Sequence, residues 1–405
     1  MDDTDAPGAF KPIDLCAKKL KKAIASAPKG SAGAGTGWQY EHIKDVTAAD
    51  PDTLHLLQAA LQVIVSGRLP KVVAAALVTS TLVALGKDNG GTRPIAIGEV
   101  LYRLAGRAVC RQKQAAFKDF FEPLQYGVMS PGGAEQIVHT ITAHLAQNPD
   151  HIITSMDSAF NSVSRKAFME NLANASSSLI GIFPMVALSY LTDSALHAYG
   201  PDGKAIRLAS KSGARQGDPL GPFLFAIAIH PVLEAELKKV HETYKALGVV
   251  VLAYLDDIYV LGPTKAALAA FNDLREALAT INLKANEEKC WAHSPRGDYT
   301  TVTQPAADGF KLTECQTPKI LGVLIGKDAA AKTSARIHAS KPKALKHKLD
   351  VLKAFARSDD KRSALALQLL LACAAPSVNY ILRASPPAVS HTMAQEADDM
   401  LIDAF

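Results

Sequence analysis

Two adjacent carboxylates, Asp256 and Asp257, are the first candidates for chemistry, because they are the only charged side chains between Gly248 and Gly262, in GVVVLAYLDDIYVLG. Neighbouring like charges repel and raise each other's pKa unless a cation neutralises them. Carboxylate oxygens are the ligands that Mg²⁺ prefers. The pair therefore fits a metal site, but it also fits a solvated turn, where Asp is common.

The apolar runs on both sides of this pair predict how it is positioned. Val249–Tyr254 and Ile258–Leu261 are rich in β-branched and aromatic residues, so we expect two strands with the carboxylates at a hairpin tip. His151–Asp157, HIITSMD, predicts a further strand, which ends on a third acid. Ser164 is expected to cap the helix that follows.

Two other stretches have residues suited to phosphate or nucleotide binding. Lys87 and Arg93 bracket a glycine-rich turn in GKDNGGTRP, which would aim two cations at a phosphate chain or leave them solvated. In GARQGDPLGP, Gly217 would let the backbone approach a ligand, and Gln216 offers a donor and an acceptor for a base or sugar. Ordinary loop chemistry would explain the same glycines.

Basic side chains gather again toward the end of the chain. Lys289 follows a helix predicted over 265–281, and Lys319–Gly326 reads as one more apolar strand. A helical region beyond it would track a nucleic-acid backbone or present a solvated face, through Arg336, Lys341, Lys343, Lys346, Lys348, Lys353 and Arg357.

Composition sets the broad class of the protein. With 405 residues and 48% hydrophobic side chains, the chain can form a large folded core, and its net charge of +5 permits a polyanionic partner. The five cysteines are scattered and form no CxxC pair, which indicates a reducing, intracellular setting. We find no apolar run as long as a membrane span, so a soluble protein is expected.

Taken in order from Trp38 onward, these blocks resemble the reverse transcriptase domain of non-LTR (LINE-like) retroelements. The resemblance rests on TRPIAIGEVLYRLAGR for the fingers hairpin, QYGVMSPGGAEQIVH for the block after it, AFNSVSR for the end of motif A, ARQGDPLGP for motif B, YLDD for motif C, LKANEEKC for motif D, LGVLIG for motif E and ACAAPSVNYILRASPP for the thumb. Each block is unspecific alone, whereas their ordered combination is specific.

The resemblance implies an α+β, right-hand polymerase fold. It would place fingers with a basic hairpin at 38–150, a palm with a ferredoxin-like antiparallel sheet and motifs A to E at 151–330, and a helical thumb at 331–405. Before these, the Gly/Ala/Ser-rich linker ASAPKGSAGAGTG predicts a flexible N-terminal tail at 1–37. The implied activity is RNA-directed DNA synthesis, with an RNA template, a DNA primer, deoxynucleoside triphosphates and Mg²⁺ or Mn²⁺. Membrane partners are not expected, and a nuclear location is implied by the resemblance alone.

The same resemblance assigns roles to individual residues. Asp157, Asp256 and Asp257 would bind the two metal ions of the reaction, and Lys289 would protonate the pyrophosphate. Phe160 would exclude a 2′-hydroxyl beneath the sugar. The remaining residues implied in substrate binding are Lys87, Arg93, Gln216 and Gly217.

Motif A departs from the family pattern. Its aspartate normally stands five residues before the aromatic of AFNSVSR, which is the position of Ser155, whereas Asp157 stands only three before Phe160. Residues two apart on a strand share a face but lie about 6.6 Å apart along it. Asp157 can therefore join the metal site only if the strand slides by two residues.

Two alternatives to reverse transcription remain open on the sequence. If the strand does not slide, the chain would be a catalytically inactive RNA-binding relic. An RNA-dependent RNA polymerase is the other, although YLDD and the aromatic of AFNSVSR disfavour it. We find no endonuclease domain, Cys/His knuckle or ribonuclease H segment, so a bare polymerase module or a fragment of a longer element is expected.

Overall fold

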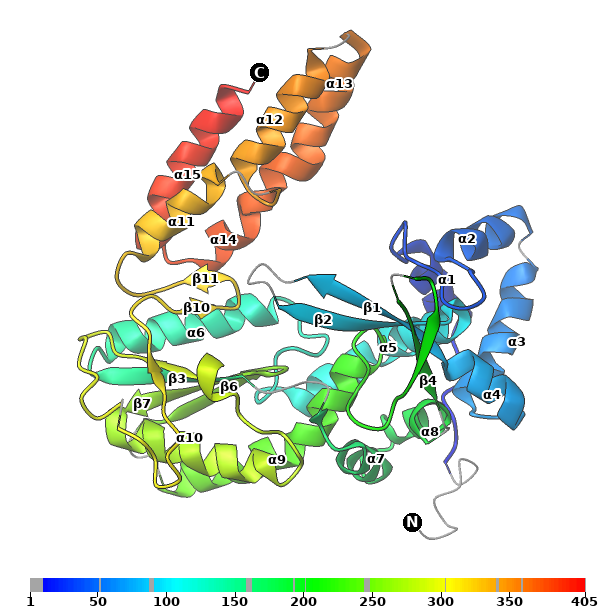
Figure 1. The fold of residues 1–405 in the computed structure, drawn as a ribbon, viewed down its shortest axis with the longest axis horizontal. Coiled ribbons are helices and arrows are strands. Elements are labelled where there is room, and N and C mark those ends of the chain that lie inside the picture. The colour runs from blue at the N-terminus through cyan, green and yellow to red at the C-terminus, as the bar shows by residue number, and fades with distance from the viewer. Residues whose placement is uncertain are drawn as a thin grey trace. The chain divides into compact units, whose positions relative to one another are not determined.

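The structure, a computed structural model, describes residues 10–50, 52–86, 91–157, 162–191, 194–200, 202–243, 248–302, 304–339, 342–357 and 360–404. The chain divides into two compact units, each assembled from separate stretches (Figure 1). Unit 1 comprises Met1–Ser130, Ser158–Lys238 and Asp273–Ala285, and unit 2 comprises Pro131–Asp157, Lys239–Asn272 and Asn286–Phe405. Helices and antiparallel-rich sheets occur in both, so the fold is mixed α+β.

Unit 1 contains a four-stranded sheet in the order β2-β1-β4-β5. Strands β1 (Ser80–Gly86) and β2 (Thr92–Gly98) pair as an antiparallel hairpin, and so do β4 (Ala195–Tyr199) and β5 (Ala205–Ala209). The sequence predicts both hairpins, the first from the glycine-rich turn in GKDNGGTRP and the second from Pro201, Asp202 and Gly203 in HAYGPDGKAIRLAS. Strand β4 joins the first hairpin through a short parallel pairing with β1.

Helices supply the core of unit 1. The longest that lies wholly within it, α5 (Val100–Phe121), buries Leu104, Phe117 and Phe121 completely. The other helices of the unit are α1 (Ala17–Ala25), α2 (Tyr40–Ala49), α3 (Thr53–Val65), α4 (Lys71–Val78), α7 (Arg165–Ala173), the 3-10 turn η3 (Ile180–Ile182), α8 (Phe183–Tyr190) and the first part of α9 (Gly221–Thr243). Ser164 caps α7 by accepting a hydrogen bond from the Ala167 amide at 3.3 Å, as predicted.

Within the N-terminal segment expected as a flexible tail over 1–37, described residues make specific tertiary contacts. Leu20 is fully buried on α1, and Gln62 of α3 accepts a hydrogen bond from the Leu15 amide at 2.8 Å and donates one to the Ile13 carbonyl at 2.9 Å. Arg103 of α5 donates to the Ala32 carbonyl at 2.8 Å. The Gly/Ala/Ser composition suggested a linker because these tertiary hydrogen bonds leave no signal in the local sequence.

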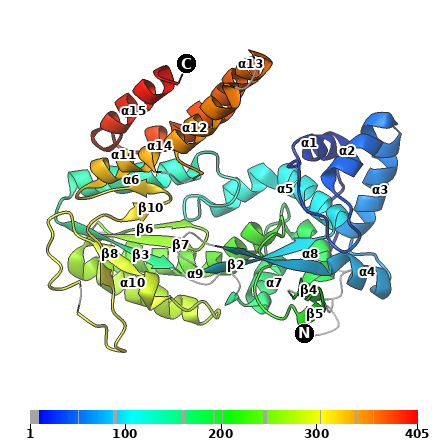
Figure 2. The same ribbon diagram turned by 45° about the horizontal axis from the view of Figure 1, so that its top comes forward.

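Unit 2 is built on a five-stranded sheet in the order β6-β7-β3-β8-β9 (Figure 2). Its strands are β3 (His151–Asp157), β6 (Val250–Tyr254), β7 (Asp257–Pro263), β8 (Trp291–His293) and β9 (Thr313–Glu314), and all neighbours are antiparallel except β8 and β9. Helix α6 (Gly133–Gln147) lies along one face of the sheet, and the start of α10 (Thr264–Ala279) along the other.

Lys319–Gly326 does not form the single strand that its apolar residues predicted. It folds back on itself as β10 (Lys319–Ile320) and β11 (Val323–Leu324), because Leu321 and Gly322 between them have φ angles of +45° and +98°. Positive φ at consecutive residues reverses the chain. The apolar run therefore concealed a turn.

The C-terminal part of unit 2 is helical. Its elements are α11 (Ala329–His338), α12 (Leu345–Ala356), α13 (Asp360–Leu369), the π segment η6 (Leu370–Ala374), the 3-10 turn η7 (Ala375–Val378), α14 (Asn379–Ala384) and α15 (Pro387–Ile402). They share a core that includes Leu345, Leu349 and Met393.

One helix in the described ranges, Arg362–Ala384, is long and apolar enough to cross a membrane by length and composition alone, although only 22% of its apolar window is buried. No such run was expected from the sequence, because this helix joins four consecutive elements, α13, η6, η7 and α14.

Candidate active site

Strand pairing in unit 2 brings two of the three predicted acids together. In the antiparallel register of β3 and β7, Asp157 lies directly opposite Asp257. Residues in opposite positions on neighbouring antiparallel strands point to the same face and have Cβ atoms about 4.5–5.5 Å apart. The ends of these two strands therefore present a pair of carboxylates on one face of the sheet.

The third acid, Asp256, belongs to the tight turn between β6 and β7. Tyr254 pairs with Asp257, so Leu255 and Asp256 alone form the turn. The hairpin was predicted, but Asp257, which was expected at its tip, is the first residue of β7. Leu255 has a φ of +55°, a left-handed conformation that is uncommon for a residue with a branched side chain. Such a conformation is maintained by the surrounding strands, and it fixes Asp256 at the hairpin tip.

Three aspartates concentrate negative charge at this site. Burial, and then the nearby charges of Asp256 and Asp157, raise the pKa of Asp257 to about 6. The Lys289 ammonium lowers the pKa of Asp257. All three aspartates therefore influence one another, as expected of a site that binds cations.

Lys289 contacts this cluster directly. Its Nζ lies 3.0 Å from Oδ1 of Asp157, in an ion pair that is partly exposed. The short 3-10 turn η5 (Glu287–Lys289) carries the lysine, and the Asn286 amide anchors that turn by donating to the Asp157 carbonyl at 2.9 Å. The loop of motif D is thus tied to the strand of motif A.

The aspartates suit Mg²⁺ by ligand type, because hard cations prefer carboxylate oxygens and a cation would relieve the repulsion that raises the pKa of Asp257. Among the residues that the structure describes, no group of three or more His, Cys, Asp or Glu side chains is arranged to hold a metal ion. One carboxylate oxygen of Asp157 is paired with Lys289 instead.

Asp157, and not Ser155, takes the position opposite motif C. Ser155 lies opposite Tyr259 on one side and Trp291 on the other, and it is 5% exposed. Asp157 therefore faces Asp257 at the end of the strand, and Ser155 lies two residues earlier on the same face.

The other predicted substrate-binding residues lie in unit 1 or outside the described ranges. Arg93 is exposed on β2, opposite Leu85 of β1. The Gln216 carbonyl accepts a hydrogen bond from the Ala96 amide at 2.7 Å, and a Cβ on Gly217 would lie 2.3 Å from the Ala96 carbonyl oxygen. Lys87 and Phe160 lie outside the described residues, so their roles stay predictions.

Sequence reasoning missed the side chains that support this motif B loop. Asp218 is buried and accepts hydrogen bonds from the hydroxyls of Tyr102, at 3.1 Å, and Tyr190, at 2.8 Å. Arg215, also buried, donates to the Val78 carbonyl at 2.6 Å. The available sequence signal was the pair of opposite charges in the short string RQGD. The partners of these residues could not be predicted, because buried charges require partners that only the fold supplies.

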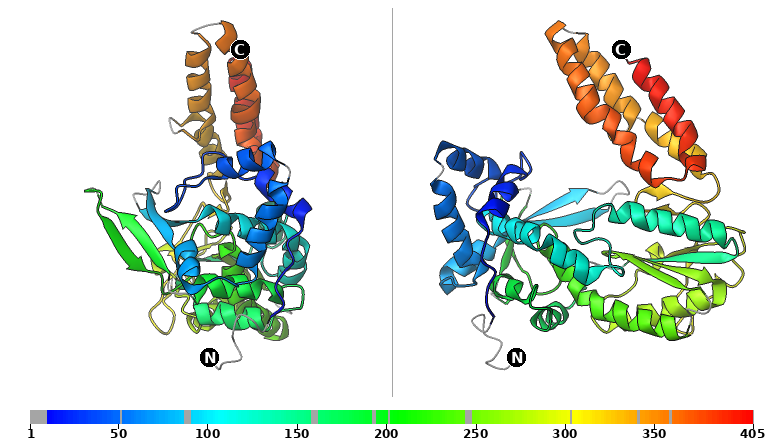
Figure 3. Two further views of the ribbon diagram at one scale, coloured as in Figure 1. Left: turned by 90° about the vertical axis from the view of Figure 1, so that its right-hand side faces the viewer. Right: turned by 180° about the vertical axis from the view of Figure 1, so that it is seen from behind.

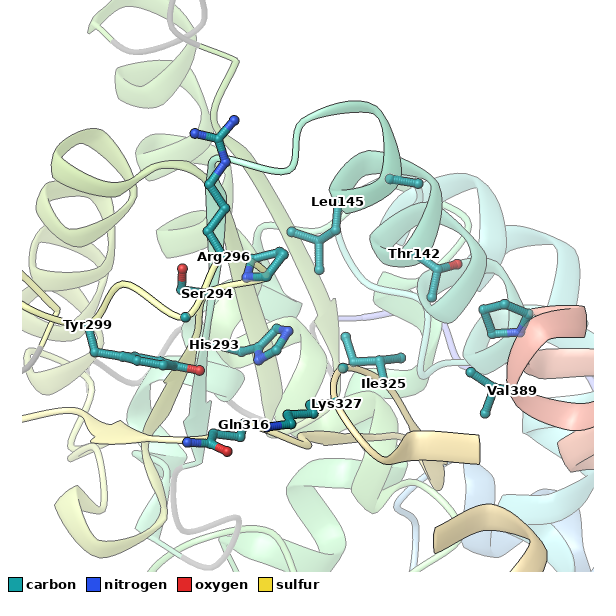
Figure 4. Close-up of a pocket in the computed structure, with 15 residues that line it drawn as sticks. Thr142, Leu145, His293, Ser294, Arg296, Tyr299, Gln316, Ile325, Lys327 and Val389 are labelled. Carbon is teal, nitrogen blue, oxygen red and sulfur yellow. The ribbon is translucent and has the colours of Figure 1, made fainter. Parts of the chain in front are cut away.

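A separate cavity of about 680 Å³ lies elsewhere in unit 2, between α6, the loop after β8 and the start of α15 (Figure 4). His293 and Tyr299 form part of its wall, and both contact the Cys315 carbonyl, at 2.8 and 3.2 Å. Burial lowers the pKa of His293, which keeps the ring neutral near pH 7. None of the seven predicted site residues that the structure describes lines this cavity.

Comparison with known families identifies the chain. The model of the family described as Reverse transcriptase (RNA-dependent DNA polymerase) matches residues 85–325. The chain belongs to the reverse transcriptase family. The matched region contains both strand-end carboxylates, the hairpin tip and the motif B loop.

Two curated relatives are proteins of retrotransposable elements. The chain is 28% identical over 275 residues to the "Retrotransposable element SLACS 132 kDa protein" of Trypanosoma brucei gambiense, covering 67% of this chain and 22% of that protein. It is 27% identical over 271 residues to the "Retrovirus-related Pol polyprotein from type-1 retrotransposable element R2" of Popillia japonica, covering 59% and 36%. The chain thus spans about a fifth to a third of these relatives' length.

A solved structure of apo telomerase from Candida tropicalis, truncated from its C-terminal domain, is also similar. The sequences are 16% identical, the match covers 53% of this chain and 50% of that one, and the TM-score is 0.41.

Proposed function

We propose that this chain is the RNA-directed DNA polymerase module of a non-LTR retroelement. The observation that carries the proposal is the register that sets Asp157 opposite Asp257, beside the tip that holds Asp256. Three carboxylates from two separate stretches of chain thereby gather at one end of the sheet. Membership of the reverse transcriptase family supplies the reaction class.

In the proposed reaction, the primer 3′-oxygen forms a bond to the α-phosphorus of a deoxynucleoside triphosphate while the bond to pyrophosphate breaks. The 3′-hydroxyl loses its proton, and the leaving pyrophosphate gains negative charge. Two divalent ions, held by Asp157, Asp256 and Asp257, would supply electrostatic stabilisation of the attacking and leaving oxygens. Lys289 is close enough to Asp157, at 3.0 Å, to serve the same site as a proton donor.

The proposal assigns the parts of a right hand to the observed elements. The five-stranded sheet of unit 2 would form the palm, within 151–330, and the helices from α11 to α15 the thumb, within 331–405. The β1–β2 hairpin would belong to the fingers, within 38–150, where Lys87 and Arg93 would bind the triphosphate. Gln216 and Gly217 would shape the nucleotide pocket, and Phe160 would exclude ribonucleotides.

An RNA-binding relic without catalysis is the second candidate. It is favoured by the ion pair between Lys289 and Asp157, which occupies one oxygen of a required ligand. Primer extension on poly(rA)/oligo(dT) separates the two candidates. We expect deoxynucleotide incorporation that requires Mg²⁺ or Mn²⁺ and falls at least about a hundredfold in Asp256→Asn.

Asp150→Asn is the matched control, because Asp150 is an exposed carboxylate just before β3 and should leave extension unchanged. RNA binding without metal-dependent extension would select the relic. Preferential incorporation of ribonucleotides would instead select an RNA-dependent RNA polymerase.

A further inference from the structure

A second basic site lies in unit 1, beneath the β4–β5 hairpin. A cavity of about 610 Å³ is lined there by residues of α7, the end of α8 and the hairpin itself. Three of its lining residues, Arg165, Arg207 and Lys211, are cations, and no carboxylate lines it in the described part of the chain. A concave surface with one sign of charge favours anions.

In the described part of the chain, no carboxylate forms an ion pair with Arg165. Its guanidinium donates to the Gly213 carbonyl at 3.2 Å, to the Ser210 carbonyl at 2.6 Å and to the Ser210 hydroxyl at 2.7 Å, and it lies 5.1 Å from the Tyr190 ring. Burial lowers the pKa of Arg165 to about 10, so the side chain is still a cation at pH 7. A half-buried cation that contacts only neutral groups is stabilised by an anionic ligand.

Ser194 adds an independent observation. This serine lines the same cavity and is 8% exposed, and its hydroxyl has no hydrogen-bond partner within the described residues. A buried hydroxyl without a partner costs free energy, whereas a ligand oxygen would satisfy it.

The hairpin above the cavity offers apolar surface to the same ligand. It extends outward in Figure 3 (left view, green), and every residue of β5 is exposed. Tyr199, Ile206 and Leu208 are exposed by 61%, 51% and 43%. Phosphate-binding cations beside exposed aromatic and aliphatic side chains are the combination that binds single strands, through the backbone and the base faces together.

We propose that this cavity binds a backbone phosphate of single-stranded RNA, with Arg207 and Lys211 pairing the phosphate oxygens and Ser194 donating to one of them. Arg165 positions the 210–213 loop through its carbonyl contacts and contributes its charge. The site lies in unit 1, whereas the three aspartates lie in unit 2, so the binding requires neither the metal ions nor catalysis.

The test measures binding of a fluorescent 15-nucleotide poly(U) strand by anisotropy in EDTA, with the full chain carrying Asp256→Asn. Arg207→Gln/Lys211→Gln should weaken binding about tenfold or more and should reduce the slope of log K against log salt by about 0.7 to 1.4. The matched control is Lys166→Gln/Lys238→Gln, which removes two exposed cations of unit 1 outside the cavity. Equal affinity and slope in the two double variants would overturn the proposal.

The Ser194→Ala variant tests whether the unpartnered hydroxyl binds a ligand or is a packing defect. We expect it to keep or raise the thermal unfolding midpoint, since a buried unpartnered group is removed, while binding of the RNA weakens several-fold. Unchanged RNA binding by Ser194→Ala would remove the serine from the site.

Inorganic phosphate distinguishes a strand from a free ion. If phosphate raises the unfolding midpoint of the parent protein but not of Arg207→Gln/Lys211→Gln, while both proteins bind the RNA equally, the site takes free phosphate and the proposal fails. Because every arm is measured without divalent metal, failure here leaves the proposed polymerase activity untouched.

Discussion

Asp257 is surrounded by charges of both signs, and its pKa of about 6 places its titration within an accessible pH range. Below this pH the carboxyl is protonated and is a poor metal ligand. Above it, the Asp257 carboxylate adds its charge beside those of Asp256 and Asp157, and the Lys289 ammonium opposes them. Under the proposed function, metal binding at this residue would therefore be coupled to proton release.

We expect primer extension at limiting Mg²⁺ to increase as the pH rises through about 6, because Asp257 must lose its proton to bind metal. Lys289→Ala removes the cation that lowers this pKa, so the rise should move to higher pH. A pH series of initial rates checks both statements. Lys284→Ala, which removes an exposed lysine from the preceding turn, should keep the parent profile, and an unshifted profile in Lys289→Ala would contradict the coupling.

The register of β3 makes a second prediction at this scale. Ser155→Asp/Asp157→Ser moves the acid to the usual family position, yet Ser155 is 5% exposed between Tyr259 and Trp291. A carboxylate buried there costs several kcal/mol, so the double variant should be inactive and should unfold at lower temperature than Asp157→Ser alone. Extension by the double variant at the parent rate would show that the strand is registered on Ser155.

At the scale of elements, the motif B loop depends on a close approach between two backbones. Gly217 has a φ of +111°, and an added Cβ would lie 2.3 Å from the Ala96 carbonyl oxygen. The neighbouring hydrogen bond from the Ala96 amide to the Gln216 carbonyl holds the loop against β2. Any side chain at Gly217 must displace one of these backbones.

Gly217→Ala should therefore lower the free energy of unfolding by about 2–4 kcal/mol, combining a steric clash with backbone strain. Gly203→Ala provides the control, because Gly203 also has a positive φ, +73°, but nothing within 4 Å of an added Cβ. That change should cost only about 1 kcal/mol. Urea unfolding of the three proteins measures the difference, and equal costs would exclude the backbone contact as the cause.

Elements determined by local sequence could be predicted, whereas features determined by contacts between distant segments could not. Alternating and β-branched residues sufficed for the β3 strand and for the β6–β7 hairpin, and the turn at Gly203 signalled the β4–β5 hairpin. The turn at Leu321 was missed because no local propensity favours positive φ at a leucine. The pairing of Asp157 with Asp257 could not be read from the sequence, because register is a property of two strands and their shared core.

At the scale of the whole molecule, the N-terminal segment is integrated into unit 1 by side chains from distant helices. Gln62 bonds both Leu15 and Ile13, and Gln112 accepts from the Cys16 amide at 2.9 Å. Buried apolar residues of α1 complete the attachment. The segment therefore contributes to the stability of the unit.

Gln62→Ala should loosen this attachment, since it leaves the Leu15 amide and the Ile13 carbonyl without their partners. We expect faster limited proteolysis between residues 10 and 30 and a lower unfolding midpoint. The free energy of unfolding should fall by about 1–3 kcal/mol. Gln147→Ala, at an exposed position in unit 2, is the control. Cleavage of the segment at the same rate in both variants would contradict the assigned role of Gln62.

The division of the chain into interleaved stretches has a consequence for how the molecule is made. Each compact unit draws on three stretches, and helices α9 and α10 each begin in one unit and end in the other. No single scission of the polypeptide can release either unit whole. A ribosome that has synthesised residues up to 130 has produced one of the three stretches of unit 1. Native assembly therefore has to wait for residues 273–285, which emerge after two of the three stretches of unit 2.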